Sequence, residues 1–100
     1  MFEALLEQIA RGLDSRSIPY MLIGGQAVLL YGEPRLTNDV DVTLGAAPDR
    51  LPVVLDLARE ANWRVLVANP VEFVAQTLVL PCEQPSSRYP SGFDLFFLAL

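Results

Sequence analysis

Two aspartates separated by one residue are the feature of this sequence most suited to chemistry. Asp39 and Asp41 lie in a stretch rich in β-formers, and a strand directs alternate side chains to the same face. Val40 and Val42 take the alternate positions, which predicts that the other face of the strand is buried. Two carboxylates this close favour a divalent cation, because Mg²⁺ is held by one or two carboxylates and by substrate phosphates.

A third acid lies near the end of the sequence, in an apolar run. Asp94 stands between Phe93 and Leu95, where a carboxylate is costly unless it is paired or bound to a metal. If its strand, expected over residues 93–98, lies beside the strand expected over residues 36–44, three carboxylates converge on one patch. The alternative is an acid on an edge strand that faces water.

Three converging carboxylates can hold two divalent ions roughly 3.5 to 4 Å apart, which is an arrangement suited to phosphoryl and nucleotidyl transfer. In this interpretation Asp39 and Asp41 hold the ion bound to a nucleoside triphosphate. Asp41 and Asp94 hold the ion that activates an acceptor hydroxyl, and Asp94 is also the candidate base. Hydrolysis, with water as the acceptor, is an alternative reaction for the same ions.

A candidate phosphate site precedes the acidic strand. Gly24 and Gly25 lie between an expected strand and an expected helix, where glycine lets backbone N–H groups approach a phosphate closely. Arg35 and Thr37 flank the start of the acidic strand and could bind or orient phosphate oxygens. The alternative for Gly24 and Gly25 is a plain turn. Arg35 could instead be solvated or form a surface ion pair with Glu33, and Thr37 could serve only as a β-former.

The elements expected around these residues alternate between helix and strand. Helices are expected over residues 2–15, 26–31, from 48 or 52 to 62, and 70–76; strands over 20–23, 36–44, 63–67, 78–82 and 93–98; and a Pro/Ser loop over 84–92. This order predicts an α/β (α+β) fold with a mixed β-sheet flanked by helices. Residues 1–100 are expected to form a single domain, complete or part of a longer chain.

Composition narrows the chemistry further. The 100 residues are 52% hydrophobic, which is enough for a packed core. The absence of His and Lys excludes histidine bases, histidine zinc sites and phosphate-binding lysines within these residues. Cys82 is single, and no apolar run reaches the roughly 18 to 20 residues of a membrane span, so a soluble cytoplasmic protein is expected. The net charge of −5 disfavours a broad nucleic-acid-binding face.

The segments Gly24-Gly25-Gln26-Ala27 and Tyr31 to Asp41, followed by Asp94, resemble the nucleotidyltransferase core of the DNA polymerase β-like superfamily. Within it the sequence is similar to the minimal nucleotidyltransferases that include the AbiEii-type toxins of toxin–antitoxin systems. The resemblance implies a nucleoside triphosphate bound with Mg²⁺ (or Mn²⁺) and transfer of a nucleoside monophosphate to an acceptor hydroxyl. Asn38 departs from the pattern, because many relatives carry lysine there, and relatives continue beyond the position of Leu100 into helices that shape the acceptor site.

The function expected is therefore a metal-dependent nucleotidyltransferase, and the acceptor stays open between tRNA, a protein and a small molecule. A cognate toxin or antitoxin protein is a candidate partner, and self-association is expected if the apolar residues 95–100 form an unpaired edge. One alternative is a catalytically inactive, antitoxin-like module that binds a nucleotide or a partner protein. Another is a purely structural role for the acidic strand.

Overall fold

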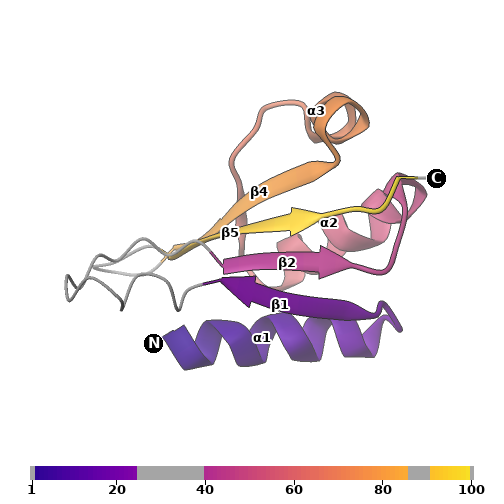
Figure 1. Cartoon of the computed structure of the whole chain (residues 1–100). Helices are drawn as coiled ribbons and strands as arrows, with labels where there is room; N and C mark the ends of the chain where they lie inside the picture. Colours follow the sequence, from indigo (N-terminus) through magenta and orange to yellow (C-terminus); the bar gives the residue numbers. More distant parts are fainter. Residues whose placement is uncertain (1, 25–39, 86–90, 100) are drawn as a thin grey trace.

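The computed structural model describes residues 2–24, 40–85 and 91–99. These residues form a five-stranded mixed sheet accompanied by helices, which confirms the expected α/β (α+β) class (Figure 1). The elements are α1 (Phe2–Ser15), β1 (Tyr20–Gly24), β2 (Val40–Leu44), the 3₁₀ helix η2 (Pro48–Arg50), α2 (Leu51–Glu60), β3 (Arg64–Val65), α3 (Pro70–Thr77), β4 (Val79–Gln84) and β5 (Ser91–Phe96).

The strands lie in the order β1-β2-β5-β4-β3, so β5 is the central strand. It pairs in parallel with β2 and antiparallel with β4, while β1 pairs antiparallel with β2. The alternative that Asp94 lies on an edge strand is therefore wrong. The premise of an unpaired apolar edge after residue 94 is also wrong, because β5 is paired on both sides and Leu95 and Phe97 are buried.

One face of the sheet is covered by α1 and α2. Leu5, Ile9 and Leu13 recur every four residues along α1 and are fully buried, as the apolar period predicts. The two helices meet where Gly12 lies against Leu57 of α2. Figure 1 views the sheet from its other side, with α2 behind it.

The opposite face of the sheet is more open. Along β2 the burial alternates, with Val40, Val42 and Leu44 buried and Asp41 and Thr43 half-buried. The same alternation runs along β4 and β5, so the described side chains on this second face are half-buried or exposed. The expectation that the acidic strand has one buried face is thus confirmed for its described part.

A hydrogen-bonded junction ties α1 to the sheet. The indole N–H of Trp63 donates to the side-chain oxygen of Gln8 at 2.8 Å, and the side-chain amide of Gln84 donates to the same oxygen at 3.2 Å. Trp63 is 6% exposed and packs edge to face on Phe93, with ring centroids 4.8 Å apart. Trp63 is therefore a core aromatic that holds the start of β5 against the helical layer.

Several predicted boundaries need correction. The loop expected over residues 84–92 is shorter, because Gln84 pairs with Ser91 and Glu83 with Gly92. The strand expected over residues 63–67 is shorter and covers only Arg64–Val65. The backbone N–H of Trp63 is not available to the sheet, because it donates to the carbonyl oxygen of Ala58 in α2 at 2.8 Å. The helix expected over residues 26–31 and the first part of the strand expected over residues 36–44 lie outside the described residues.

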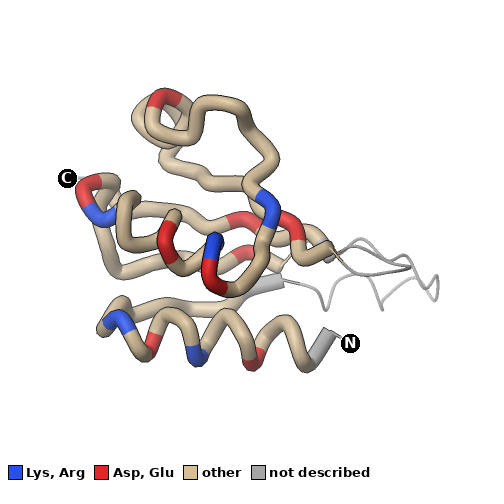
Figure 2. The backbone as a smooth tube through the Cα atoms, turned by 180° about the vertical axis from the view of Figure 1, so that it is seen from behind, with Lys and Arg blue, Asp and Glu red and all other residues tan. Residues whose placement is uncertain are grey.

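Charges of both signs are interspersed on the helical side of the molecule (Figure 2). Ion pairs join Arg11 to Glu7 within α1, and Arg16, which directly follows α1, to Glu60 of α2, the latter at 2.8 Å. Such pairs at a solvated surface contribute little to stability, but they leave no single-sign face on these helices. Within the described residues, no helix combines the length and the apolar character that crossing a bilayer requires.

Candidate functional site

Two of the predicted acids lie next to each other on the open face of the sheet. Asp41 of β2 and Asp94 of β5 are Cα partners in the parallel ladder. Their chain neighbours Val40, Val42, Phe93 and Leu95 are 2%, 0%, 2% and 0% exposed on the opposite face. Because alternate residues of a strand face opposite ways, both carboxylates leave the sheet on its open side, from strands about 4.8 Å apart.

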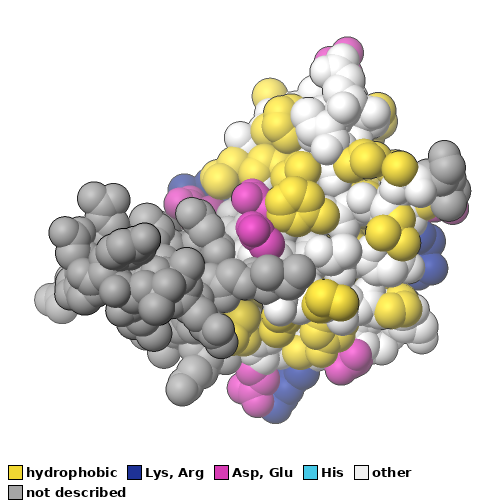
Figure 3. Space-filling view, viewed as in Figure 1, with side chains coloured by type: hydrophobic (Ala, Val, Ile, Leu, Met, Phe, Trp, Pro, Cys, Tyr) yellow, Lys and Arg dark blue, Asp and Glu magenta, His cyan; other side chains and the backbone are white. Residues whose placement is uncertain are grey.

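Among the described residues, this pair has both polar and apolar neighbours on the open face: Thr43 and Glu83, and Pro81 and Phe96. The residue opposite Asp94 on β4 is Pro81, which has neither a charge nor a backbone N–H. In Figure 3, acidic side chains lie in the middle of this face, bordered by hydrophobic ones. A cation bound at Asp41 and Asp94 would lie between two half-buried side chains, where its attraction to carboxylates is stronger than in bulk water.

Gly24 lies near Asp41, because its strand β1 pairs with β2. It is the last residue of β1 and pairs with Val40, and the next pair of the same ladder is Ile23 with Asp41. The end of β1 is thus one step along the ladder from the carboxylate of β2. The backbone of Gly24 is on the side of Asp41 that faces the beginning of β2.

The other predicted site residues, Gly25, Arg35, Thr37 and Asp39, lie outside the described residues. The structure therefore brings together Asp41, Asp94 and Gly24.

The donor set fits a hard divalent cation. Carboxylates from two adjacent strands, both partly exposed on one face, are ligands of the kind that Mg²⁺ and Mn²⁺ accept together with phosphate oxygens. Within the described ranges, no group of three His, Cys, Asp or Glu side chains gathers as a complete metal site. Asp41 and Asp94 would accordingly supply part of the ligand set.

The pKa of the Cys82 thiol is affected by burial and by Asp94 on the neighbouring strand. The thiol is 1% exposed on the covered face, and it lies on β4 opposite Phe93. Burial, with a smaller contribution from the negative charge of Asp94, raises the pKa of Cys82 from 9.0 to about 12. The thiol therefore stays protonated at neutral pH and is a poor nucleophile.

The arginines of the described residues are all engaged elsewhere. Arg11, Arg16 and Arg59 form ion pairs on the helices, Arg50 donates to the carbonyl oxygen of Arg16 at 3.3 Å, and Arg64 pairs with Glu83 at 2.9 Å. A guanidinium for substrate phosphates would have to come from residues beyond this set.

Thr43 is a further residue of this face, and the motif formed by Asp39, Asp41 and Asp94 does not include it. The sequence could have predicted its position, because Thr43 follows Asp41 by two positions in a strand and must share its face. Its register partners are Met21 on β1 and Phe96 on β5.

No protein-family model, curated protein or solved structure matches this chain.

Proposed function

We propose that the protein is a metal-dependent nucleotidyltransferase that transfers a nucleoside monophosphate from a nucleoside triphosphate to an acceptor hydroxyl. The observation that supports this proposal is the register pairing of Asp41 with Asp94 on one open sheet face. An Asp-x-Asp strand beside a strand carrying a third acid can provide the carboxylates that nucleotidyl transfer needs.

Each residue has a distinct task in this proposal. Asp41 and Asp94 would hold Mg²⁺ or Mn²⁺, and Asp39 is the third ligand that the sequence motif supplies. When bound, the ions neutralise charge on the triphosphate. Asp94 would also accept the proton of the attacking hydroxyl, because it lies level with Asp41 on the neighbouring strand.

The phosphate groups are proposed to lie at the end of β1. There the backbone N–H groups of Gly24 and Gly25 would donate to phosphate oxygens, with Arg35 and Thr37 as further contacts. A cytoplasmic location goes with this function, because nucleoside triphosphates are made and used there. A toxin or antitoxin protein as partner also belongs to this proposal, through the resemblance of the motif.

The first test is calorimetric titration of each nucleoside triphosphate into the protein, with and without Mg²⁺. We expect binding that needs Mg²⁺ and that is lost in Asp41→Asn and in Asp94→Asn. Asp49→Asn is the matched control, because Asp49 is an exposed acid of η2, outside the proposed site. Equal binding in the absence of Mg²⁺, or binding that survives both site variants, would contradict the proposed metal site.

A second measurement separates transfer from binding alone. Release of pyrophosphate from the bound triphosphate, with the nucleoside monophosphate passing to an added alcohol or to water, is expected in the wild-type protein and not in Asp94→Asn. Metal-dependent binding without any pyrophosphate release would instead identify the inactive, antitoxin-like binding module. Release of inorganic phosphate in place of pyrophosphate would identify a phosphohydrolase.

A further inference from the structure

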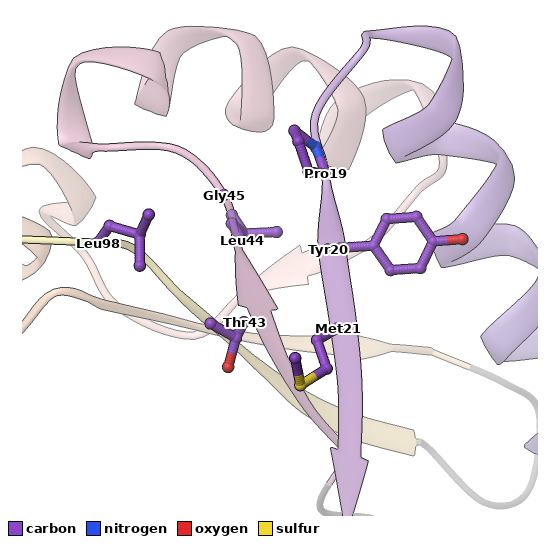
Figure 4. Close-up of a pocket in the computed structure, with 7 residues that line it drawn as sticks. All are labelled: Pro19, Tyr20, Met21, Thr43, Leu44, Gly45 and Leu98. Carbon is purple, nitrogen blue, oxygen red and sulfur yellow. The ribbon is translucent and has the colours of Figure 1, made fainter.

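A shallow apolar hollow of about 230 Å³ lies on the open face at the far end of β1 and β2. The residues that line it are Pro19, Tyr20, Met21, Thr43, Leu44, Gly45 and Leu98. In Figure 4, Met21 and Thr43 point to the same side of the sheet, whereas Tyr20 points the other way, towards α1. Two backbone hydrogen bonds hold lining residues in place: the Gly45 N–H donates to the Pro19 carbonyl oxygen at 2.7 Å, and the Leu98 N–H donates to the Ala46 carbonyl oxygen at 2.9 Å.

The hollow shares a ladder with the acidic pair. Going along β1 and β2, the paired residues are Gly24 with Val40, Ile23 with Asp41, Leu22 with Val42, and Met21 with Thr43. Thr43 is two residues beyond Asp41, which is about 7 Å along a strand on the same face. The carboxylates therefore lie between the end of β1 at Gly24 and the hollow.

We propose that this hollow is the acceptor subsite, and that it takes an uncharged, largely apolar acceptor group of side-chain size that carries one hydroxyl. This inference rests on the proposed nucleotidyltransferase function and adds to it the class of acceptor. The occupant would lie over Met21 and Thr43 and direct its hydroxyl towards Asp94.

The geometry of the reaction supports this position. In nucleotidyl transfer the attacking and leaving oxygens are roughly in line through the reacting phosphorus. The acceptor oxygen forms a bond to the α-phosphorus, its proton passes to the Asp94 carboxylate, and the bond from this phosphorus to pyrophosphate breaks, with the electron pair leaving on pyrophosphate. If the pyrophosphate lies on the Gly24 side of Asp41, the acceptor must approach from the opposite side, where the hollow is.

The chemistry of the lining supports the acceptor class. None of the described lining residues is charged, and their two hydroxyl groups belong to Thr43 and to Tyr20, whose side chain points towards α1 (Figure 4). Met21 is 61% and Leu98 46% exposed. A phosphate-rich acceptor would need cationic groups along its path. The described arginines are engaged with acids or a backbone carbonyl, so they do not provide such a path.

The test compares acceptors and one hollow-filling variant. The acceptors are benzyl alcohol and cyclohexanol, which are neutral and apolar, and the dinucleotide UpU, which ends in ribose hydroxyls and carries a phosphate. Pyrophosphate release from the preferred Mg²⁺–triphosphate is measured with each. Met21→Trp fills the hollow from an exposed position, and Leu66→Trp is the control, since Leu66 is 50% exposed and lies outside the hollow.

We expect the neutral alcohols to stimulate release more than UpU does. Met21→Trp should lower this stimulation roughly 10- to 100-fold by displacing the acceptor, while triphosphate binding stays at its wild-type value. Leu66→Trp should change neither quantity. Circular dichroism melting of both variants confirms that they are folded.

Three outcomes would overturn the inference while the proposed function stands: stronger stimulation by UpU, no stimulation by any acceptor although Mg²⁺–triphosphate binds, or full stimulation in Met21→Trp. Absence of triphosphate binding in the wild-type protein is a different result. It would overturn the proposed function, and the acceptor subsite with it.

Discussion

Asp41 and Asp94 are register partners on two parallel strands, although they lie far apart in the sequence. Parallel strands need a crossover connection, and here α2, β3, α3 and β4 all lie between β2 and β5 along the chain. The fold therefore sets two carboxyl side chains level with each other on one face. Carboxylate oxygens from two adjacent strands can bind one divalent cation together, so such a cation should be stabilising.

Mg²⁺ is accordingly expected to raise the melting temperature of the wild-type protein. At a free Mg²⁺ concentration about ten times the dissociation constant, linkage adds about 1.4 kcal/mol to the free energy of unfolding. For a domain of this size that corresponds to a rise of roughly 5 to 10 °C. Differential scanning calorimetry should show no such rise for Asp41→Asn or Asp94→Asn, and a normal rise for Asp49→Asn. A full rise in both site variants would place the ion elsewhere.

The hydrogen bond from Trp63 to Gln8 is expected to contribute measurably to stability. Gln8→Leu leaves the buried indole N–H without the acceptor that it has at 2.8 Å, at a cost of about 1 to 3 kcal/mol in the free energy of unfolding. Gln8→Glu keeps an acceptor oxygen at this place and should cost less. Urea unfolding followed by the fluorescence of Trp63, the only tryptophan, measures both variants. Equal stabilities of the two variants would show that the bond contributes nothing.

The contact between α1 and α2 at Gly12 predicts that Gly12→Ala has opposite effects on stability depending on the side chain at position 57. A Cβ added at Gly12 would lie 2.5 Å from Cδ1 of Leu57, a side chain that is 3% exposed. Overpacking costs about 1 to 3 kcal/mol, which exceeds the gain of up to about 1 kcal/mol from replacing a helical glycine by alanine. Gly12→Ala should therefore destabilise the wild-type protein.

In the Leu57→Ala background the obstructing atoms are gone, so Gly12→Ala should stabilise the protein by up to about 1 kcal/mol. Urea unfolding of the four proteins of this cycle gives the coupling between the two positions. The same effect of Gly12→Ala in both backgrounds would mean that Leu57 does not limit the approach of the helices.

Cys82 predicts a loss of stability at alkaline pH. The unfolded thiol ionises near pH 9.0 and the folded one near 12, so between these values the unfolded state binds fewer protons than the folded state. The contribution of this group is fully present below pH 9 and falls by about 1.4 kcal/mol per pH unit above it. Urea unfolding between pH 8 and 10.5 should show a shallower pH dependence for Cys82→Ala than for the wild-type protein. Parallel curves would contradict the raised pKa, whatever the absolute stabilities.

Local sequence patterns predicted most of the elements, because their signals are local. Leu5, Ile9 and Leu13 have the helical period of α1, and the alternation of Val40, Asp41 and Val42 is that of a strand with one buried face. Polar and glycine residues misled the prediction at Gln84, Ser91 and Gly92, which were expected in a loop. There the hydrogen bonds of the β4–β5 ladder override weak strand propensity.

The sequence by itself determined which residues can do chemistry and which face of its strand Asp41 occupies, since side-chain alternation depends only on the strand. The tertiary structure decided that β5 is central, that Asp94 is level with Asp41, and that an apolar hollow lies beyond them on the same face. Strand order and register follow from contacts between residues distant along the chain. No local pattern encodes them, because the free energy of pairing depends on which partner the rest of the fold brings alongside.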